Sequence, residues 1–140
     1  MINFFVPGVP KPQGSKRAFV NPKTNRAVIV EDNSKTRDWR GDVKIFAREA
    51  YLGAPMEKAV HVQVQFIMPR PKSTPKTRPT PRATKKPDVD KLLRTILDAL
   101  TGTVWRDDSQ VVYLLGTKRI AEIDEQPGAR IRVEELNDPA

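Results

Sequence analysis

The segment covering residues 69–87 is the strongest constraint on the fold, because it suits neither a helix nor the interior of a sheet. It contains six prolines and seven Lys or Arg residues, with no acidic residue. Proline lacks a backbone N–H, and so basic a stretch cannot bury a core. We therefore predict an extended, mobile basic loop here. The core must then be built from the residues on either side of it.

The length of the chain bounds the number of domains. A chain of 140 residues supports one core, so we expect a single domain over residues 1–140. Hydrophobic residues make up 38% and charged residues 30%, as in an ordinary globular protein. No apolar run has the length of a membrane helix, and the first residues lack the layout of a signal peptide, so we expect a cytoplasmic protein.

Apolar periodicity predicts the elements before the basic loop. Residues 2–6 are typical of a strand, followed by a basic loop over residues 11–17 and a hairpin formed by residues 18–20 and 27–30. From residue 34 to about residue 52, apolar residues recur every three to four positions, which indicates an amphipathic helix that includes Trp39.

Strands and a second helix are expected around and after the basic loop. Strict alternation over residues 60–66 predicts a strand with one face in the core. Residues 88–100 show a helical stripe, and residues 110–120 and 129–133 are typical of two closing strands. The fold class is therefore α+β, a small mixed β-sheet packed against two main helices.

The composition limits which catalytic and metal-binding groups the chain can use. The chain has no cysteine and only one histidine, His61, so disulfides, thiolate nucleophiles and zinc sites based on cysteine are excluded. Catalysis would fall to carboxylates, lysines and hydroxyls. The net charge of +8 indicates a polyanionic partner, because neutralised phosphates release counterions.

Aspartates gather on either side of the second expected helix. Asp88 and Asp90 stand at its start, and Asp107 and Asp108 stand just before the next strand. One acid of the first pair could simply cap the helix, and the second pair could form a polar turn. Acids that converge in a basic protein would repel one another unless a cation lies between them. Mg²⁺, a hard ion bound by oxygen, suits such a site, which is typical of phosphodiester hydrolysis.

The spacing of these acids resembles the catalytic segment of the RusA family of Holliday-junction resolvases. The matching motifs are Asp88-Val89-Asp90 with Leu92, then Asp98-Ala99-Leu100, then Asp107-Asp108 followed by Gln110-Val111. The beginning of the chain, with Gly8, Pro10 and Lys16-Arg17, is weakly similar as well. The resemblance implies a dimeric, Mg²⁺-dependent endonuclease, with Mn²⁺ as an alternative ion, that resolves four-way DNA junctions by paired symmetric nicks in recombination and repair. Family members often occur in phages and prophages.

The resemblance also implies roles for individual residues. Asp88, Asp90 and Asp108 would be the metal-binding catalytic acids, with Asp107 as an adjacent metal ligand. The chain departs from the family pattern at two places: Lys91 stands where Asn is usual, and Arg94 stands where the catalytic lysine is usual. Arginine keeps the charge but cannot readily give up a proton, so Arg94 would act electrostatically and Lys91 could partly replace the missing lysine.

Three further features have alternative interpretations. Asp98 is expected to form a helical salt bridge with Arg94. Trp105 could insert at the junction crossover, but a buried core position is favoured. The dimer interface could use the strand at residues 111–115 or the helix bearing Trp39, although both are more readily explained as core.

Basic loops would bind the junction arms through phosphates, without reading sequence; the alternative is disordered, solubilising charge. The predicted DNA-binding residues are Lys11, Lys16, Arg17, Arg70, Lys72, Lys76, Arg78, Arg82, Lys85 and Lys86. Two rival functions stay open: a flap or fork nuclease with the same metal site, and a non-catalytic basic DNA-binding module in which the acids only cap and turn. Binding to a membrane surface is disfavoured, because no amphipathic apolar face backs the basic residues.

Overall fold

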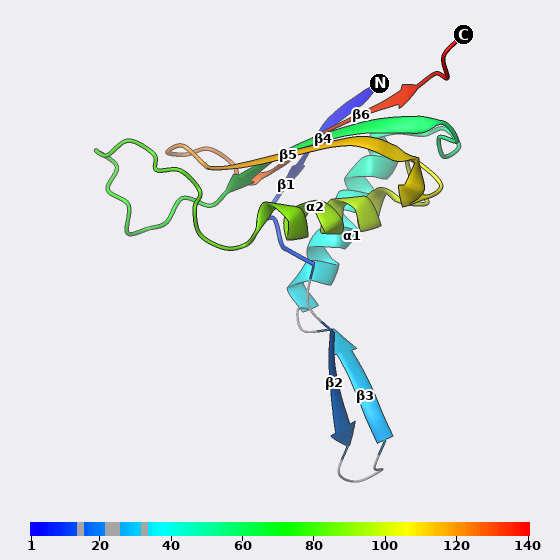
Figure 1. Cartoon of the computed structure of the whole chain (residues 1–140). Helices are drawn as coiled ribbons and strands as arrows, with labels where there is room; N and C mark the ends of the chain where they lie inside the picture. The colour runs from blue at the N-terminus through cyan, green and yellow to red at the C-terminus, as the bar shows by residue number, and fades with distance from the viewer. Residues whose placement is uncertain (14–15, 22–25, 32–33) are drawn as a thin grey trace.

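The computed structural model describes residues 1–13, 16–21, 26–31 and 34–140, with side chains described for residues 1–13 and 38–140. A four-stranded sheet carries both main helices on one face (Figure 1). The elements in chain order are β1 (Ile2–Pro7), β2 (Lys16–Asn21), β3 (Arg26–Glu31), α1 (Ser34–Ala50), β4 (Ala59–Met68), α2 (Val89–Leu100), the 3₁₀ helix η1 (Asp108–Gln110), β5 (Val111–Ile120) and β6 (Gly128–Leu136).

Strand β4 organises the sheet, whose order is β1-β6-β4-β5. The alternation in the sequence is confirmed: Val62, Val64 and Phe66 are buried, while the residues between them are only half-buried. β4 pairs antiparallel with β6 and parallel with β5. The sheet is therefore mixed, and the prediction of an α+β fold with two main helices is confirmed.

The core lies between the sheet and the two helices. Helix α1 contributes Trp39 and Val43, and α2 contributes Leu92, Ile96 and Leu100. Burying each such side chain stabilises the fold by about 1.5–3 kcal/mol. Trp39 is 3% exposed, so it is a core residue, which is the role that the sequence favoured for it.

The hairpin of β2 and β3 projects away from the main sheet (Figure 1). Its first strand begins at Lys16, which pairs with Glu31, and Arg17 pairs with Val30. The prediction that both residues belong to the preceding basic loop is therefore wrong, because antiparallel backbone pairing draws them into the strand. Their side chains lie outside the described residues.

One segment differs in burial from what its apolar sequence suggests. Residues 112–115 of β5 are each more than 40% exposed, so the expectation that they form core is wrong. They lie on an edge strand, which the sequence pattern cannot reveal. Trp105, by contrast, is fully buried, which confirms the core interpretation over insertion at a junction. Among the described residues, no helix is long and apolar enough to span a membrane.

The segment at residues 69–87 contains no helix or strand, as expected. The Arg70 guanidinium organises it from within, donating to Oγ1 of Thr80 at 2.5 Å and to the carbonyl oxygens of Pro75 and Arg78, each at 3.2 Å. The Thr80 hydroxyl in turn donates to Glu122 at 2.7 Å. These bonds attach the loop to the turn between β5 and β6.

Candidate functional site

Helix α2 presents a charged stripe because of its residue spacing. Asp90, Arg94 and Asp98 follow one another at intervals of four, which places them on one face of the helix. All three are exposed, while Leu92 and Ile96 on the opposite face are fully buried. Packing of the apolar face against the sheet therefore fixes which way the charged face points.

A groove of about 330 Å³ runs along this stripe. It brings together three acids from two places in the sequence, namely Asp90 and Asp98 of α2 and Asp108 of η1. Its lining consists of Asp90, Leu93, Arg94, Leu97 and Asp98 from α2, Asp108 from η1 and Leu114 from β5. Asp88 and Asp107 do not line it.

The Asp108 carboxylate is anchored from the core. The indole Nε1 of Trp105 donates to Oδ1 of Asp108 at 3.2 Å and to Oγ1 of Thr101 at 3.1 Å. The Thr101 hydroxyl also hydrogen-bonds the same Asp108 oxygen. Because Trp105 is fully buried, this carboxylate is connected to a rigid part of the molecule. No sequence motif pointed to Thr101 or to this role of Trp105.

Asp107 has a structural role of its own. It is the N-cap of η1, where its Oδ1 accepts from Ser109 N at 2.8 Å, and this bond holds the pKa of Asp107 below its ordinary value. Gln110 completes the capping box by accepting from the Asp107 backbone N–H at 2.8 Å. The polar-turn interpretation is thus confirmed for Asp107. The Asp-x-x-Gln spacing of a capping box could have revealed it from sequence.

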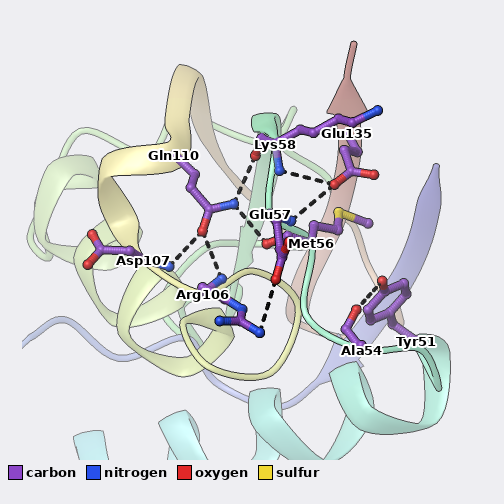
Figure 2. Close-up of polar contacts among 9 residues, drawn as sticks. All are labelled: Tyr51, Ala54, Met56, Glu57, Lys58, Arg106, Asp107, Gln110 and Glu135. Atoms are coloured by element: carbon purple, nitrogen blue, oxygen red, sulfur yellow. Dashed lines mark hydrogen bonds and ion pairs between the residues drawn. The ribbon is translucent and has the colours of Figure 1, made fainter. Parts of the chain in front are cut away.

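Gln110 also joins η1 to the segment that leads into β4. Its side-chain amide donates to the carbonyl oxygens of Met56 and Lys58, both at 2.8 Å. Figure 2 shows these bonds, with the Asp107 carboxylate pointing away from them. Arg106 adds an ion pair to Glu57 at 3.0 Å. The turn that carries Asp108 is therefore held on two sides.

The start of α2 carries the other predicted acid, Asp88. It occupies the N-cap position, but its side chain accepts no capping hydrogen bond. Its carboxylate instead lies 3.8 Å from the Lys91 ammonium, one turn along. Lys118 of β5 holds the preceding segment by donating to the carbonyl oxygens of Lys85 at 2.7 Å and Pro87 at 2.9 Å. No sequence motif indicated a role for this lysine.

The predicted DNA-binding residues differ in exposure and in their distance from α2. Lys72, Lys76, Arg78, Arg82, Lys85 and Lys86 are exposed, Lys11 is half-exposed, and Arg70 is engaged within its loop. The loop bearing Lys11 is fixed beside α2, because Gln13 N donates to the Lys91 carbonyl at 3.1 Å. Positive charge therefore lies beside the helix that carries the acids.

The candidate ligand atoms at this site are of the chemical type that binds Mg²⁺. They are exposed carboxylate oxygens, the ligands that this hard ion prefers. In the part of the chain that the structure describes, no three acidic, histidine or cysteine side chains form a group that could hold one ion. Asp90 and Asp108 share the groove without forming such a group, so ion binding requires further oxygen ligands, such as water or substrate phosphate.

Comparison with known proteins agrees with the motif. Residues 7–134 match the family model described as endodeoxyribonuclease RusA. The chain is also 28% identical over 144 residues to the uncharacterized protein YqaN of Bacillus subtilis (strain 168), with 97% of each chain covered. Nucleases of the matched family act on DNA and depend on metal. The family match covers most of the chain, and the protein therefore belongs to the RusA family of endodeoxyribonucleases.

Proposed function

We propose that this protein is a Holliday-junction resolvase, which cuts four-way DNA junctions by paired symmetric nicks in the presence of Mg²⁺. One observation supports this most strongly: a single groove collects Asp90, Asp98 and Asp108 beside Arg94, in a protein of net charge +8 from a nuclease family. Carboxylates among cations are suited to phosphodiester hydrolysis, since they bind a divalent ion while the cations attract the phosphate.

Charged residues in the groove and beside it have separate roles in this proposal. Asp90 and Asp108 in the groove would hold Mg²⁺ or Mn²⁺ together with oxygens of water or substrate phosphate. Asp88 at the start of α2 and Asp107, which already serves as a cap, are further candidate ligands beside the groove. The bound ion would supply a more acidic water and charge stabilisation at the phosphate. Arg94 would bind the non-bridging phosphate oxygens as a permanent cation. Lys91, which lies beside Asp88, would partly replace the family's lysine, since an ammonium can give up a proton more readily than a guanidinium.

The basic segments would hold the junction arms. Exposed Lys72, Lys76, Arg78, Arg82, Lys85 and Lys86 would contact phosphates, together with Lys11 and the Lys16 and Arg17 pair of β2. Such contacts are independent of sequence, as recognition of branched shape requires. Arg70 would contribute by giving the loop its conformation.

Paired nicks imply two sites related by a two-fold axis, so we propose a homodimer acting on DNA in the cytoplasm, in recombination and repair or in the related processing of phage genomes. The groove of each copy would then bind and cut one of the two symmetric strands at the crossover.

The decisive experiment compares cleavage of a synthetic four-way junction, a flap and a fork by the purified protein, with and without Mg²⁺. We expect paired nicks on the junction only when the ion is present. Preferred cutting of flaps or forks would identify a different structure-selective nuclease. Binding of DNA without any nick, whatever the ion, would leave a DNA-binding module and contradict the proposal.

A further inference from the structure

The face of the sheet that carries no helix is open in the described part of the chain (Figure 1). Alternate residues of β4 are buried beneath the helices, so the residues between them, Gln63 and Gln65, point to this open face. The strand register places Arg132 of β6 opposite Gln63, and Arg130 opposite Gln65. Two guanidiniums and two amides therefore lie in adjacent rows on the open face.

A groove of about 250 Å³ lies among these side chains. No acidic residue is found among the described residues that line it, and its polar side chains are those of Asn3, Gln63, Gln65, Thr117, Arg130 and Arg132. All six can donate hydrogen bonds, and the amides and the hydroxyl can also accept them. This composition suits a ligand that combines negative charge with both donors and acceptors.

The two arginines of the groove are not neutralised by any acid of the described chain. The Arg130 guanidinium lies over the ring of Phe5, 5.4 Å from its centroid. Nε of Arg132 donates to the sulfur of Met1 at 2.9 Å. Within the described residues, the terminal nitrogens of both guanidiniums are free to bind an anion, and phosphate matches their forked geometry.

Aromatic rings border the groove on the same face. Phe5 of β1 lies opposite Arg130. At the other end of the rows, His61 of β4 lies beside Tyr113 of β5, and their rings form an edge-to-face pair with centroids 4.1 Å apart. Tyr113 is 51% exposed. Exposed rings beside arginines on a sheet are typical of surfaces on which unpaired bases stack.

We propose that this open face of the sheet binds a segment of single-stranded DNA. Arg130 and Arg132, about 6.8 Å apart along the strand, would bind phosphates, while the amides would bond to base edges. Four strands span about 14 Å, which is more than the width of about 12 Å of the major groove. The sheet therefore cannot enter a duplex to reach base edges, so the strand that it reads must be unpaired.

This inference goes beyond the proposed function, because the open face lies across the sheet from the metal-binding groove. That groove is lined by α2 and by Leu114, which pairs with Val62 on the face that the helices cover. An unpaired strand held on the open face would leave the metal-binding groove accessible to a second segment of DNA. The protein would then favour branched DNA that includes a single-stranded arm or gap.

Fluorescence anisotropy with a labelled thymidine oligomer of about 12 nucleotides tests the site, in EDTA so that no DNA is cut. We expect the double change Arg130→Gln and Arg132→Gln to weaken oligomer binding by at least about tenfold. The slope of the logarithm of the binding constant against the logarithm of salt concentration should become less steep by up to about 1.4, since each phosphate contact to a single strand contributes about 0.7.

The matched control is the double change Lys44→Gln and Arg48→Gln, which removes the same charge from α1. It should alter oligomer binding by less than about twofold, because phosphate contacts act at short range in salt. A duplex of the same length is the second control, and its affinity should be unchanged in the Arg130 and Arg132 variant. Circular dichroism verifies that both variants fold.

The inference is overturned if the Arg130 and Arg132 variant binds the oligomer normally, if the α1 control weakens binding equally, or if duplex affinity falls as much. Tighter binding of the corresponding uridine oligomer would assign the face to RNA and contradict it as well. Since the measurement is of binding in EDTA, a protein that cuts no junction can still retain this site. A protein that cuts junctions and fails this test would contradict only the inference.

Discussion

The indole Nε1 of Trp105, a fully buried residue, donates a hydrogen bond of 3.2 Å to the carboxylate of Asp108, an exposed residue on the groove. One end of the bond belongs to the core and the other to the candidate site. Thr101 reinforces it by bonding both groups. A carboxylate held in this way keeps its orientation when an ion or a phosphate approaches, which reduces the reorganisation needed for binding.

Removing the indole N–H should therefore lower metal affinity and cleavage activity while the core remains packed. We expect Trp105→Phe to lower the cleavage rate and the affinity for Mg²⁺ by roughly 10-fold to 100-fold, the usual cost of losing an outer hydrogen bond to a metal ligand. Isothermal titration with Mg²⁺ and single-turnover cleavage measure the two effects. Thr101→Ser retains the hydroxyl and should stay close to the unaltered protein, whereas Thr101→Val should not. Normal metal affinity in Trp105→Phe would show that the bond is incidental.

The proposed metal ligands should be needed for cutting and not for binding. We expect Asp88→Asn, Asp90→Asn and Asp108→Asn each to reduce nicking to below about 1% of the unaltered rate. This loss is larger than the one expected for Trp105→Phe, which removes only a hydrogen bond to a ligand. Affinity for the junction should change little, because phosphate contacts supply it. Asp42→Asn, at an exposed acid on α1, serves as the control. Retained activity in all three variants would discredit the site.

Arg94 and Lys91 differ in their distance from the groove, and their variants should differ as well. Arg94 lines it, while Lys91 lies beside Asp88 at 3.8 Å. We expect Arg94→Ala to lower the cleavage rate by about 100-fold, as for other groups that stabilise charge at the reacting centre, and Arg94→Lys to restore part of it. Lys91→Ala should cost less. If neither alanine variant is slower, both residues belong to the solvated face of α2.

The salt dependence of the DNA-binding constant should show whether the loop at residues 69–87 contacts DNA. Each phosphate contact contributes a slope of about −0.9 in the logarithm of the binding constant against the logarithm of salt concentration. We expect the combined change Lys72→Gln, Lys76→Gln and Arg82→Gln to make the slope less steep by up to about 2.7. Arg70 is retained, since it holds the loop together. An unchanged slope would indicate that these charges only aid solubility.

The turn between β5 and β6 should make the protein slightly less stable in acid. Two hydrogen bonds from Arg119, at 2.6 and 2.7 Å, hold the pKa of Glu125 at about 2, against an ordinary value of 4.5. A lowered pKa contributes stability above pH 4.5, and this contribution is lost as the pH falls from 4.5 towards 2. The pair is partly exposed, so the contribution is below about 1 kcal/mol.

Comparison with Glu125→Gln tests this effect. The variant should be slightly less stable than the unaltered protein at pH 7 and equal to it near pH 2, as measured by urea unfolding. A stability difference that stays constant across this range would contradict the proposed ion pair.

The local elements could be predicted from the sequence. Alternation in β4 and the three-to-four spacing in α1 and α2 follow from side-chain geometry within one element, so each pattern can be interpreted without knowing its neighbours. The acid motif identified the family for a similar reason, since its spacing is local to one helix and the turn after it.

Tertiary structure decided what depends on distant contacts. The apolar residues 112–115 look like core in the sequence. They are exposed because β5 is the last strand in the sheet order β1-β6-β4-β5. Arg70 looks like one more phosphate-binding cation, and only the fold of its loop shows that it bonds carbonyl oxygens there. The burial of Trp105, which anchors Asp108, likewise depends on a remote segment, since Trp105 forms a β-bridge with Met56. Spacing along the chain determines which face a side chain takes, whereas burial and partnership depend on which remote segments arrive beside it.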